Sequence, residues 1–247
     1  MKASADRVVL VGEPPLVEEY AGLFRTAGFS VTARSNSSRT AGMRQRRAQS
    51  GTFAPRTAQL AIELTNVDLA TKRRNLLSLE RNTPPSTPIL SSSVTVSAAE
   101  QASWLQRPER LVGICAMPTF LTGQLVELAP TVHTSSGAVT GAKAAIVRCG
   151  KEVAVVQDRI GMVLPRIVCM LVNEAAFNVM EGTATPQDID TAMKLGTNYP
   201  YGPIEWAENI GVGNVVAVLE ALHRDLGEER YRVCPLLRQL SHGKKWW

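Results

Sequence analysis

Short apolar runs and longer segments with helical spacing alternate along the first 156 residues of the chain. A short apolar run between Gly, Pro or polar residues is typical of a strand, whereas apolar residues three and four positions apart indicate a helix. Strands are therefore predicted at 7–12, 29–33, 59–64, 88–91, 110–114, 125–128 and 152–156, and helices at 16–27, 69–80, 98–105 and 136–149. This alternation is typical of a parallel sheet with crossover helices.

From Gly161 onward the pattern is helical to the end. The clearest helix signal begins at Thr185, which has the properties of an N-cap and is followed by Pro186 at the first helical position. Gly196 is suited to end this helix, and a turn rich in Pro and Gly leads into the next one. We therefore expect two domains, an α/β domain at 1–157 and an all-helical domain at 158–247.

The composition of the chain argues against several kinds of binding partner. Hydrophobic residues make up 45% and charged residues 20%, as in an ordinary globular protein, and the net charge is +5. No basic stripe with interspersed aromatics suggests nucleic acid, and the apolar helix around 167–172 is too short to span a membrane. The four cysteines lack metal-site spacing, so no metal is expected and a reduced, cytoplasmic setting fits best.

The segment 185–206, TPQDIDTAMKLGTNYPYGPIEW, closely resembles the C-terminal domain of the 3-hydroxyacyl-CoA dehydrogenases. Further matching segments are AIEL at 61–64, DLATK at 68–72, RPERLVG at 107–113 and DRIG at 158–161, so the resemblance covers nearly the whole chain. It implies a Rossmann-like domain followed by a helical dimerisation domain. The helices around 167–177 and 215–222 keep apolar faces, and a homodimer is expected.

The resemblance also implies a glycine-rich turn after the first strand that would hold the diphosphate of a dinucleotide. Here the turn reads Gly12-Glu-Pro-Pro-Leu-Val17, in which only Gly12 of the three glycines remains. Pro14 and Pro15 lack the N–H groups that a phosphate needs, and Glu13 adds negative charge. The sequence therefore predicts that no cofactor is likely.

Binding of NAD(P) nevertheless remains an open alternative. The resemblance places Glu63 and Lys72 where the family contacts the nicotinamide dinucleotide, although both could instead form a surface ion pair or a helix-cap charge. Ser35 stands where an acidic residue would bind the ribose, and the preceding Arg34 could hold a 2′-phosphate or be a solvated surface residue.

The catalytic residues implied by the resemblance are only partly present. Cys115 occupies the position of the family's catalytic histidine, whereas Glu127 keeps the position of the glutamate that orients it. Thr95 or Ser93 is the counterpart of a serine that contacts substrate. The family's asparagine aligns with Pro165, beside Arg166, and we take these two as further substrate-site candidates.

A thiol does not simply replace an imidazole. A free thiol titrates near 8.5, and a neighbouring carboxylate raises its pKa further, so proton transfer coupled to hydride transfer should be impaired. Cys115 could be an inert buried residue or, because it lies at a strand end, a reactive one. The chain is thus expected to be a degenerate member of the family.

Three functions remain open at this point. The leading hypothesis is a cofactor-independent cyclisation, dehydration, isomerisation or thioester cleavage of a β-keto, polyketide-like or acyl-thioester substrate, with Glu127 as general acid or base. The alternatives are a non-catalytic partner subunit and a working NAD(P)-dependent 3-hydroxyacyl-CoA dehydrogenase. The arginine-rich stretch at 35–56 could meet CoA phosphates or be a solvated loop.

Overall fold

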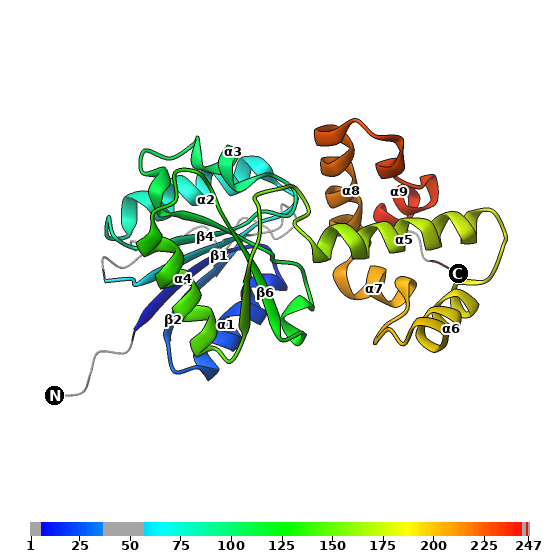
Figure 1. The fold of residues 1–247 in the computed structure, drawn as a ribbon, viewed down its shortest axis with the longest axis horizontal. Coiled ribbons are helices and arrows are strands. Elements are labelled where there is room, and N and C mark those ends of the chain that lie inside the picture. Colours follow the sequence, from blue (N-terminus) through cyan, green and yellow to red (C-terminus); the bar gives the residue numbers. More distant parts are fainter. Residues whose placement is uncertain (1–5, 37–56, 244–245, 247) are drawn as a thin grey trace, which may run out of the picture.

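The computed structural model describes residues 6–36, 57–243 and 246, so most of the arginine-rich stretch at 35–56 lies outside the described residues. An α/β domain is followed by a helical domain, and the two lie side by side along the long axis of the molecule (Figure 1). The strands are β1 (Arg7–Gly12), β2 (Ser30–Ser35), β3 (Leu60–Leu64), β4 (Ile89–Ser92), β5 (Leu111–Ile114), β6 (Leu125–Pro130) and β7 (Glu152–Val155). The helices are α1 (Leu16–Thr26), α2 (Leu69–Asn82), α3 (Ala98–Ala102), α4 (Ser136–Arg148), α5 (Leu164–Met180), α6 (Pro186–Thr197), α7 (Pro203–Ile210), α8 (Val212–Leu226) and α9 (Pro235–Ser241).

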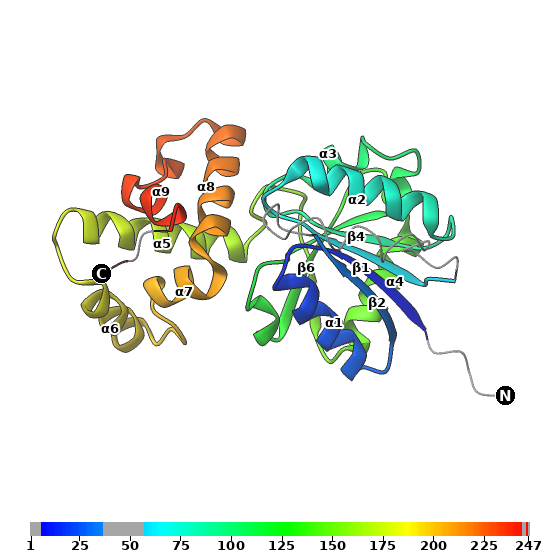
Figure 2. The ribbon, with the colours of Figure 1, turned by 180° about the vertical axis from the view of Figure 1, so that it is seen from behind.

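The seven strands form one sheet in the order β2-β1-β3-β4-β5-β6-β7. Helices α1 and α4 cover one face of the sheet, and α2 and α3 cover the other, as Figures 1 and 2 show from opposite sides. Strands β1 to β5 are parallel, which confirms the predicted Rossmann-like arrangement. Strand β6 differs, because it runs antiparallel to β5. The connection at 115–124 contains only a short 3-10 turn, and a connection of this length cannot return the chain for a parallel strand.

Strands β1 and β3 approach each other closely at their carboxyl ends. A Cβ atom on Gly12 would lie 2.5 Å from the carbonyl carbon of Leu64, so any larger residue would force the two strands apart. The chain passes from β1 to β2 on one side and then crosses to β3 on the other, which makes the gap between β1 and β3 the switch point of the sheet. Ligands of such folds bind in the crevice at this point.

The family-like segment at 185–206 folds as two helices joined by a fixed turn. The Thr185 hydroxyl accepts from the Asp188 N–H and caps α6, as predicted. Asp190 accepts hydrogen bonds from the N–H groups of Ile204 and Glu205 at the start of α7. A Cβ on Gly202 would fall on the Asp190 carboxylate, so this turn requires glycine. The segment is therefore a structural unit that sets the angle between α6 and α7.

The two domains are joined by residues 156–163, between the end of β7 and the start of α5. Asp158 within this segment accepts hydrogen bonds from the N–H groups of Ala98 and Ala99 at the start of α3. The predicted boundary at residue 157 falls in this segment and stays a prediction. Within the described ranges, no helix is long and apolar enough to cross a membrane.

The α/β domain contains a fully buried ion pair. Lys72 Nζ lies 2.5 Å from Glu63 Oε2 and 2.8 Å from the carbonyl oxygen of Thr65, and both charged side chains are 0% exposed. Asn75 and Ser91 also donate to the Glu63 carboxylate. Removal of either partner would leave an uncompensated charge in a low-dielectric interior. Both residues are therefore needed for the stability of the fold.

We predict that Lys72→Met lowers the free energy of unfolding by about 3–5 kcal/mol, since the Glu63 carboxylate would stay buried without its cation. Urea unfolding followed by circular dichroism measures this loss. The control is Asp6→Asn, which breaks the exposed Arg148–Asp6 pair and should cost less than about 1 kcal/mol. Equal losses in the two variants would contradict the prediction.

Candidate functional site

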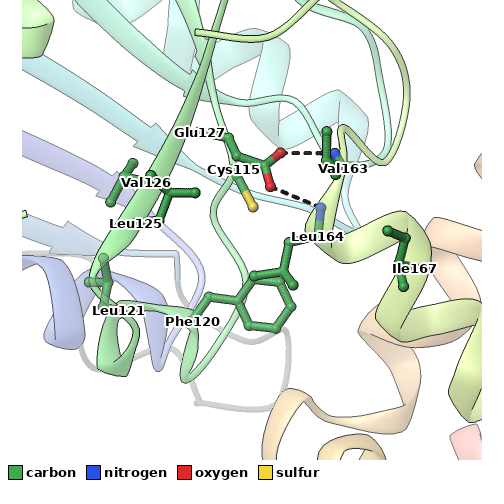
Figure 3. A pocket seen from close by; sticks show the side chains of 9 residues that line it. All are labelled: Cys115, Phe120, Leu121, Leu125, Val126, Glu127, Val163, Leu164 and Ile167. Carbon is green, nitrogen blue, oxygen red and sulfur yellow. Dashed lines mark hydrogen bonds between the residues drawn. The ribbon is translucent and has the colours of Figure 1, made fainter. Parts of the chain in front are cut away.

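A pocket of about 200 Å³ lies between the α/β domain and the first turns of α5 (Figure 3). Its walls are mainly apolar, and Glu127 is the single charged residue among those that line it. The lining residues are Cys115, Phe120, Leu121, Leu125, Val126, Glu127, Val163, Leu164 and Ile167. An apolar cavity with few polar groups is the usual form of a small-molecule site.

Glu127 projects from β6 and reaches across the domain junction. Its carboxylate accepts hydrogen bonds from the N–H of Val163 at 2.8 Å and the N–H of Leu164 at 2.9 Å, drawn as dashed lines in Figure 3. These N–H groups belong to the start of α5, where the helix dipole favours negative charge. The side chain is 5% exposed. Glu127 therefore caps the first helix of the helical domain as well as lining the pocket.

Cys115 follows β5 directly and lies opposite Glu127. Its N–H donates to the carbonyl oxygen of Glu127 at 3.0 Å, and its own carbonyl accepts from the hydroxyl of Tyr20 at 3.3 Å. Figure 3 shows the thiol beside the Glu127 carboxylate, inside the pocket. Burial raises the pKa of the Cys115 thiol well above its usual value, and the charge of Glu127 raises it further. The thiol is consequently protonated at neutral pH.

The other predicted catalytic and substrate residues lie outside the pocket lining. The Thr95 hydroxyl donates to the carbonyl oxygen of Asn66 at 2.7 Å, and the Ser93 hydroxyl donates to the carbonyl oxygen of Ser91 at 3.1 Å. Both side chains are buried, and their hydroxyl protons are used within the protein. In this structure their visible role is to hold the loop after β4.

Pro165 and Arg166 lie in the first turn of α5. Pro165 is buried, whereas the Arg166 guanidinium stacks 5.1 Å from the centre of the Tyr231 ring and donates to the Tyr231 hydroxyl. Arg166 is therefore engaged with the helical domain. Of the six predicted catalytic and substrate residues, the pocket brings together Cys115 and Glu127.

The predicted cofactor residues lie near the switch point but are enclosed. Glu63 and Lys72 form the buried pair described above, so the surface ion pair considered from the sequence is wrong. Both side chains are 0% exposed and offer no atom at the surface. Gly12 allows β1 and β3 to approach each other, and its place in the switch-point crevice agrees with the position implied by the resemblance.

Glu13, which the sequence identified only as an unfavourable charge, bridges the crevice. Its carboxylate accepts from the N–H groups of Asn66 at 2.9 Å, Val67 at 3.1 Å and Asp68 at 3.3 Å. Its own N–H donates to the carbonyl oxygen of Leu64 at 3.1 Å. With two prolines next in the chain, the first turn does not fit a diphosphate in this arrangement, because a carboxylate holds the nearby donors.

Asn66 has a structural role at this edge of the sheet that the sequence did not predict. Its amide donates to the carbonyl oxygen of Ala116 at 2.8 Å, and its side-chain oxygen accepts from the Ser92 hydroxyl at 2.6 Å. It thereby ties together the carboxyl ends of three neighbouring strands, β3, β4 and β5. Its position directly after a predicted buried strand is the sequence signal that could have identified it. Phe120 and Ile167, which wall the pocket, carry no such signal because their contacts are tertiary.

Comparison with known proteins identifies both parts of the chain. Residues 161–245 match the family described as 3-hydroxyacyl-CoA dehydrogenase, C-terminal domain. Residues 30–159, more than half of the chain, match 3-hydroxyacyl-CoA dehydrogenase, NAD binding domain. The second match begins after β1 and α1, so the turn that contains Glu13 precedes it.

Curated relatives include the probable 3-hydroxybutyryl-CoA dehydrogenase of Bacillus subtilis, 35% identical over 182 residues, which are 74% of this chain and 63% of the relative. The 3-hydroxyadipyl-CoA dehydrogenase of Escherichia coli is 42% identical over 119 residues, which are 48% of this chain and 25% of that protein. The matches thus span less than two thirds of the length of these relatives.

Solved structures share the fold over nearly the full chain. FadB2 of M. tuberculosis superposes with a TM-score of 0.82 at 23% identity, covering 99% of both chains. The (S)-3-hydroxybutyryl-CoA dehydrogenase of Ralstonia eutropha superposes with a TM-score of 0.79 at 24% identity, covering 97% of this chain and 94% of that one.

The expectation that no cofactor is likely is wrong, because the α/β domain matches an NAD-binding domain and the relatives are named as dehydrogenases. The first turn alone does not decide whether the whole domain binds a cofactor. The chain belongs to the 3-hydroxyacyl-CoA dehydrogenase family.

Proposed function

We propose that this protein is a nicotinamide-dependent dehydrogenase of 3-hydroxyacyl thioesters with a slow proton-transfer step. The observation that carries the proposal is the match of both domains to the 3-hydroxyacyl-CoA dehydrogenase family, with an apolar pocket that contains Glu127 at the domain junction. Relatives named as 3-hydroxybutyryl-CoA and 3-hydroxyadipyl-CoA dehydrogenases support an acyl-thioester substrate.

A bound nicotinamide dinucleotide would supply the hydride acceptor. Since the first turn does not fit the diphosphate as it stands, we derive no step through the cofactor. The chain's own contribution is an apolar pocket that excludes water and a thiol that can donate a hydrogen bond to the substrate oxygen. Because its pKa is raised, the Cys115 thiol is a poor base at neutral pH.

Glu127 is poorly placed to take over as a general base. Both carboxylate oxygens already accept hydrogen bonds from the N–H groups at the start of α5, and these bonds hold the carboxylate in place. Moving a proton onto Glu127 would weaken the cap that joins the domains. The slow step in this proposal is therefore removal of the proton from the substrate hydroxyl.

A second candidate is a reaction of the same thioester that needs no hydride transfer, such as dehydration, isomerisation, cyclisation or thioester cleavage, on a β-keto or polyketide-like chain. The presence of Cys115 where the resemblance implies a histidine favours it. The absence of the histidine also supports a third candidate, a non-catalytic partner subunit. These candidates are separated from the first by whether the protein reduces acetoacetyl-CoA with NADH.

The proposal includes a homodimer formed through the helical domain. The apolar residues Val215, Val218, Leu219 and Leu222 are buried within that domain, so they are not available to a second copy. Met180 and Leu195 are exposed on the same domain and are better candidates for contact. A cytoplasmic location remains a prediction from cysteine usage.

We predict that Cys115→His raises the rate of acetoacetyl-CoA reduction by NADH at least roughly 100-fold, because a positioned imidazole contributes 10²–10⁴-fold as acid or base. Steady-state kinetics at saturating NADH measure the gain in rate. The control is Cys115→Ser, which keeps a small neutral hydrogen-bond donor at this position. A fast wild-type enzyme that the histidine does not improve would contradict the slow proton step. Bound NADH without turnover in any variant would favour the second candidate.

The raised pKa of Cys115 predicts slow alkylation. Only the thiolate reacts, so the rate for Cys115 should keep rising with pH beyond pH 9 without reaching a plateau, whereas the unfolded chain should level off near the ordinary thiol pKa. Iodoacetamide labelling followed by peptide mass spectrometry measures each cysteine separately. Rapid labelling of native Cys115 at pH 7 would show that the thiol is ionised.

We predict that the wild-type protein is a dimer by light scattering at micromolar concentration and that Leu195→Glu shifts it towards monomer. Leu195 is 83% exposed, so a glutamate there costs nothing in the monomer but would be desolvated at a contact. The matched change Val132→Glu, on the turn before α4 where Val132 is 94% exposed, should leave the mass unchanged. A monomeric wild-type protein would refute the dimer.

A further inference from the structure

The crevice at the switch point is closed by groups of the chain itself. It opens at the carboxyl ends of β1 and β3, where Gly12 meets Leu64 in the ladder. Glu13 follows Gly12 and makes four hydrogen bonds across this gap, one through its N–H and three through its carboxylate. All four bonds reach the segment that ends β3 and leads into α2.

The three N–H groups that Glu13 binds form an anion-binding arrangement. They belong to consecutive residues, Asn66, Val67 and Asp68, immediately before α2, a helix of 14 residues. Consecutive backbone N–H groups in such a turn, beside a helix N-terminus, hold phosphate or carboxylate oxygens. In this chain the anion that occupies them is the Glu13 carboxylate.

We infer that Glu13 is an internal competitor for the cofactor diphosphate and sets a low affinity for the dinucleotide. The inference rests on the proposed function only in placing the dinucleotide at the switch point. A diphosphate lying across the crevice between β1 and β3 meets both the negative charge of Glu13 and donors that are already used. The carboxylate must swing out before the cofactor can bind.

The geometry allows this movement. Glu13 is partly exposed, and the loop on the other side of the crevice is also capped by Asp68, which accepts from the Thr71 N–H at 2.9 Å. Release of Glu13 therefore leaves the α2 cap in place while freeing three N–H donors. The energy lost from those hydrogen bonds is subtracted from the binding free energy of the dinucleotide.

The test compares the affinity for NADH of the wild-type protein, Glu13→Gln and Glu13→Ala, measured by fluorescence titration without any acyl thioester. Glu13→Gln should bind NADH about tenfold more tightly, the expected order for removing one charge a few ångströms from a phosphate at a half-exposed site. Glu13→Ala, which also frees the donors, should bind at least as tightly. ADP-ribose should show the same gains, because the effect acts on the diphosphate.

Thermal unfolding supplies the second readout. Both Glu13 variants should unfold at a lower temperature than the wild type, since they lose hydrogen bonds, so stability and affinity change in opposite directions. Asp158→Asn is the matched control, because the Asp158 carboxylate also accepts from two N–H groups, at the start of α3, but lies outside the crevice. This variant should lose stability without gaining affinity for NADH. Unchanged or weaker NADH binding in both Glu13 variants, including no binding at millimolar NADH, would overturn the inference. Tighter binding without reduction of acetoacetyl-CoA would uphold it and refute the proposed dehydrogenase activity.

Discussion

The site depends on one interaction, the capping of α5 by Glu127. The carboxylate comes from the sheet, and the two N–H groups that it accepts from come from the start of the helical domain. The pocket wall formed by Val163, Leu164 and Ile167 stands where it does because this cap fixes the first turn of α5. A single buried charge thus positions a helix and completes a cavity.

Polar side chains also bind other parts of the protein along the carboxyl edge of the sheet. Glu13, Asn66 and Thr95 form hydrogen bonds to the ends of neighbouring strands and loops. Glu63 forms an ion pair with Lys72. Buried polar groups need partners, so an edge that is largely satisfied by its own side chains is stable without a ligand. A ligand that binds there must replace internal hydrogen bonds and does not simply fill open donors.

The order of elements and the two-domain organisation were predictable because they follow from local patterns. The strands at β1, β3 and β5 are apolar runs, and α6 begins at a recognisable cap, Thr185. The antiparallel direction of β6 was missed because the alternation of strands and helices does not by itself give strand direction, although the short connection at 115–124 was visible in the sequence. The placement of Cys115 beside Glu127 was predicted only through a family resemblance. The engagement of Thr95 and Arg166 elsewhere depends on tertiary contacts that no local pattern contains.

The reversed direction of β6 has a consequence for how this pocket can change. In the antiparallel ladder Ile114 pairs with Leu128, and directly after β5 the Cys115 N–H donates to the Glu127 carbonyl, which places Cys115 opposite Glu127. The two side chains are thus held by strand pairing and not by the loop at 116–124, which supplies Phe120 and Leu121 to the pocket wall. Substitutions and length changes in that loop would reshape the pocket while Cys115 and Glu127 stay in register. The shape of the pocket and the position of the pair can therefore change independently in this fold.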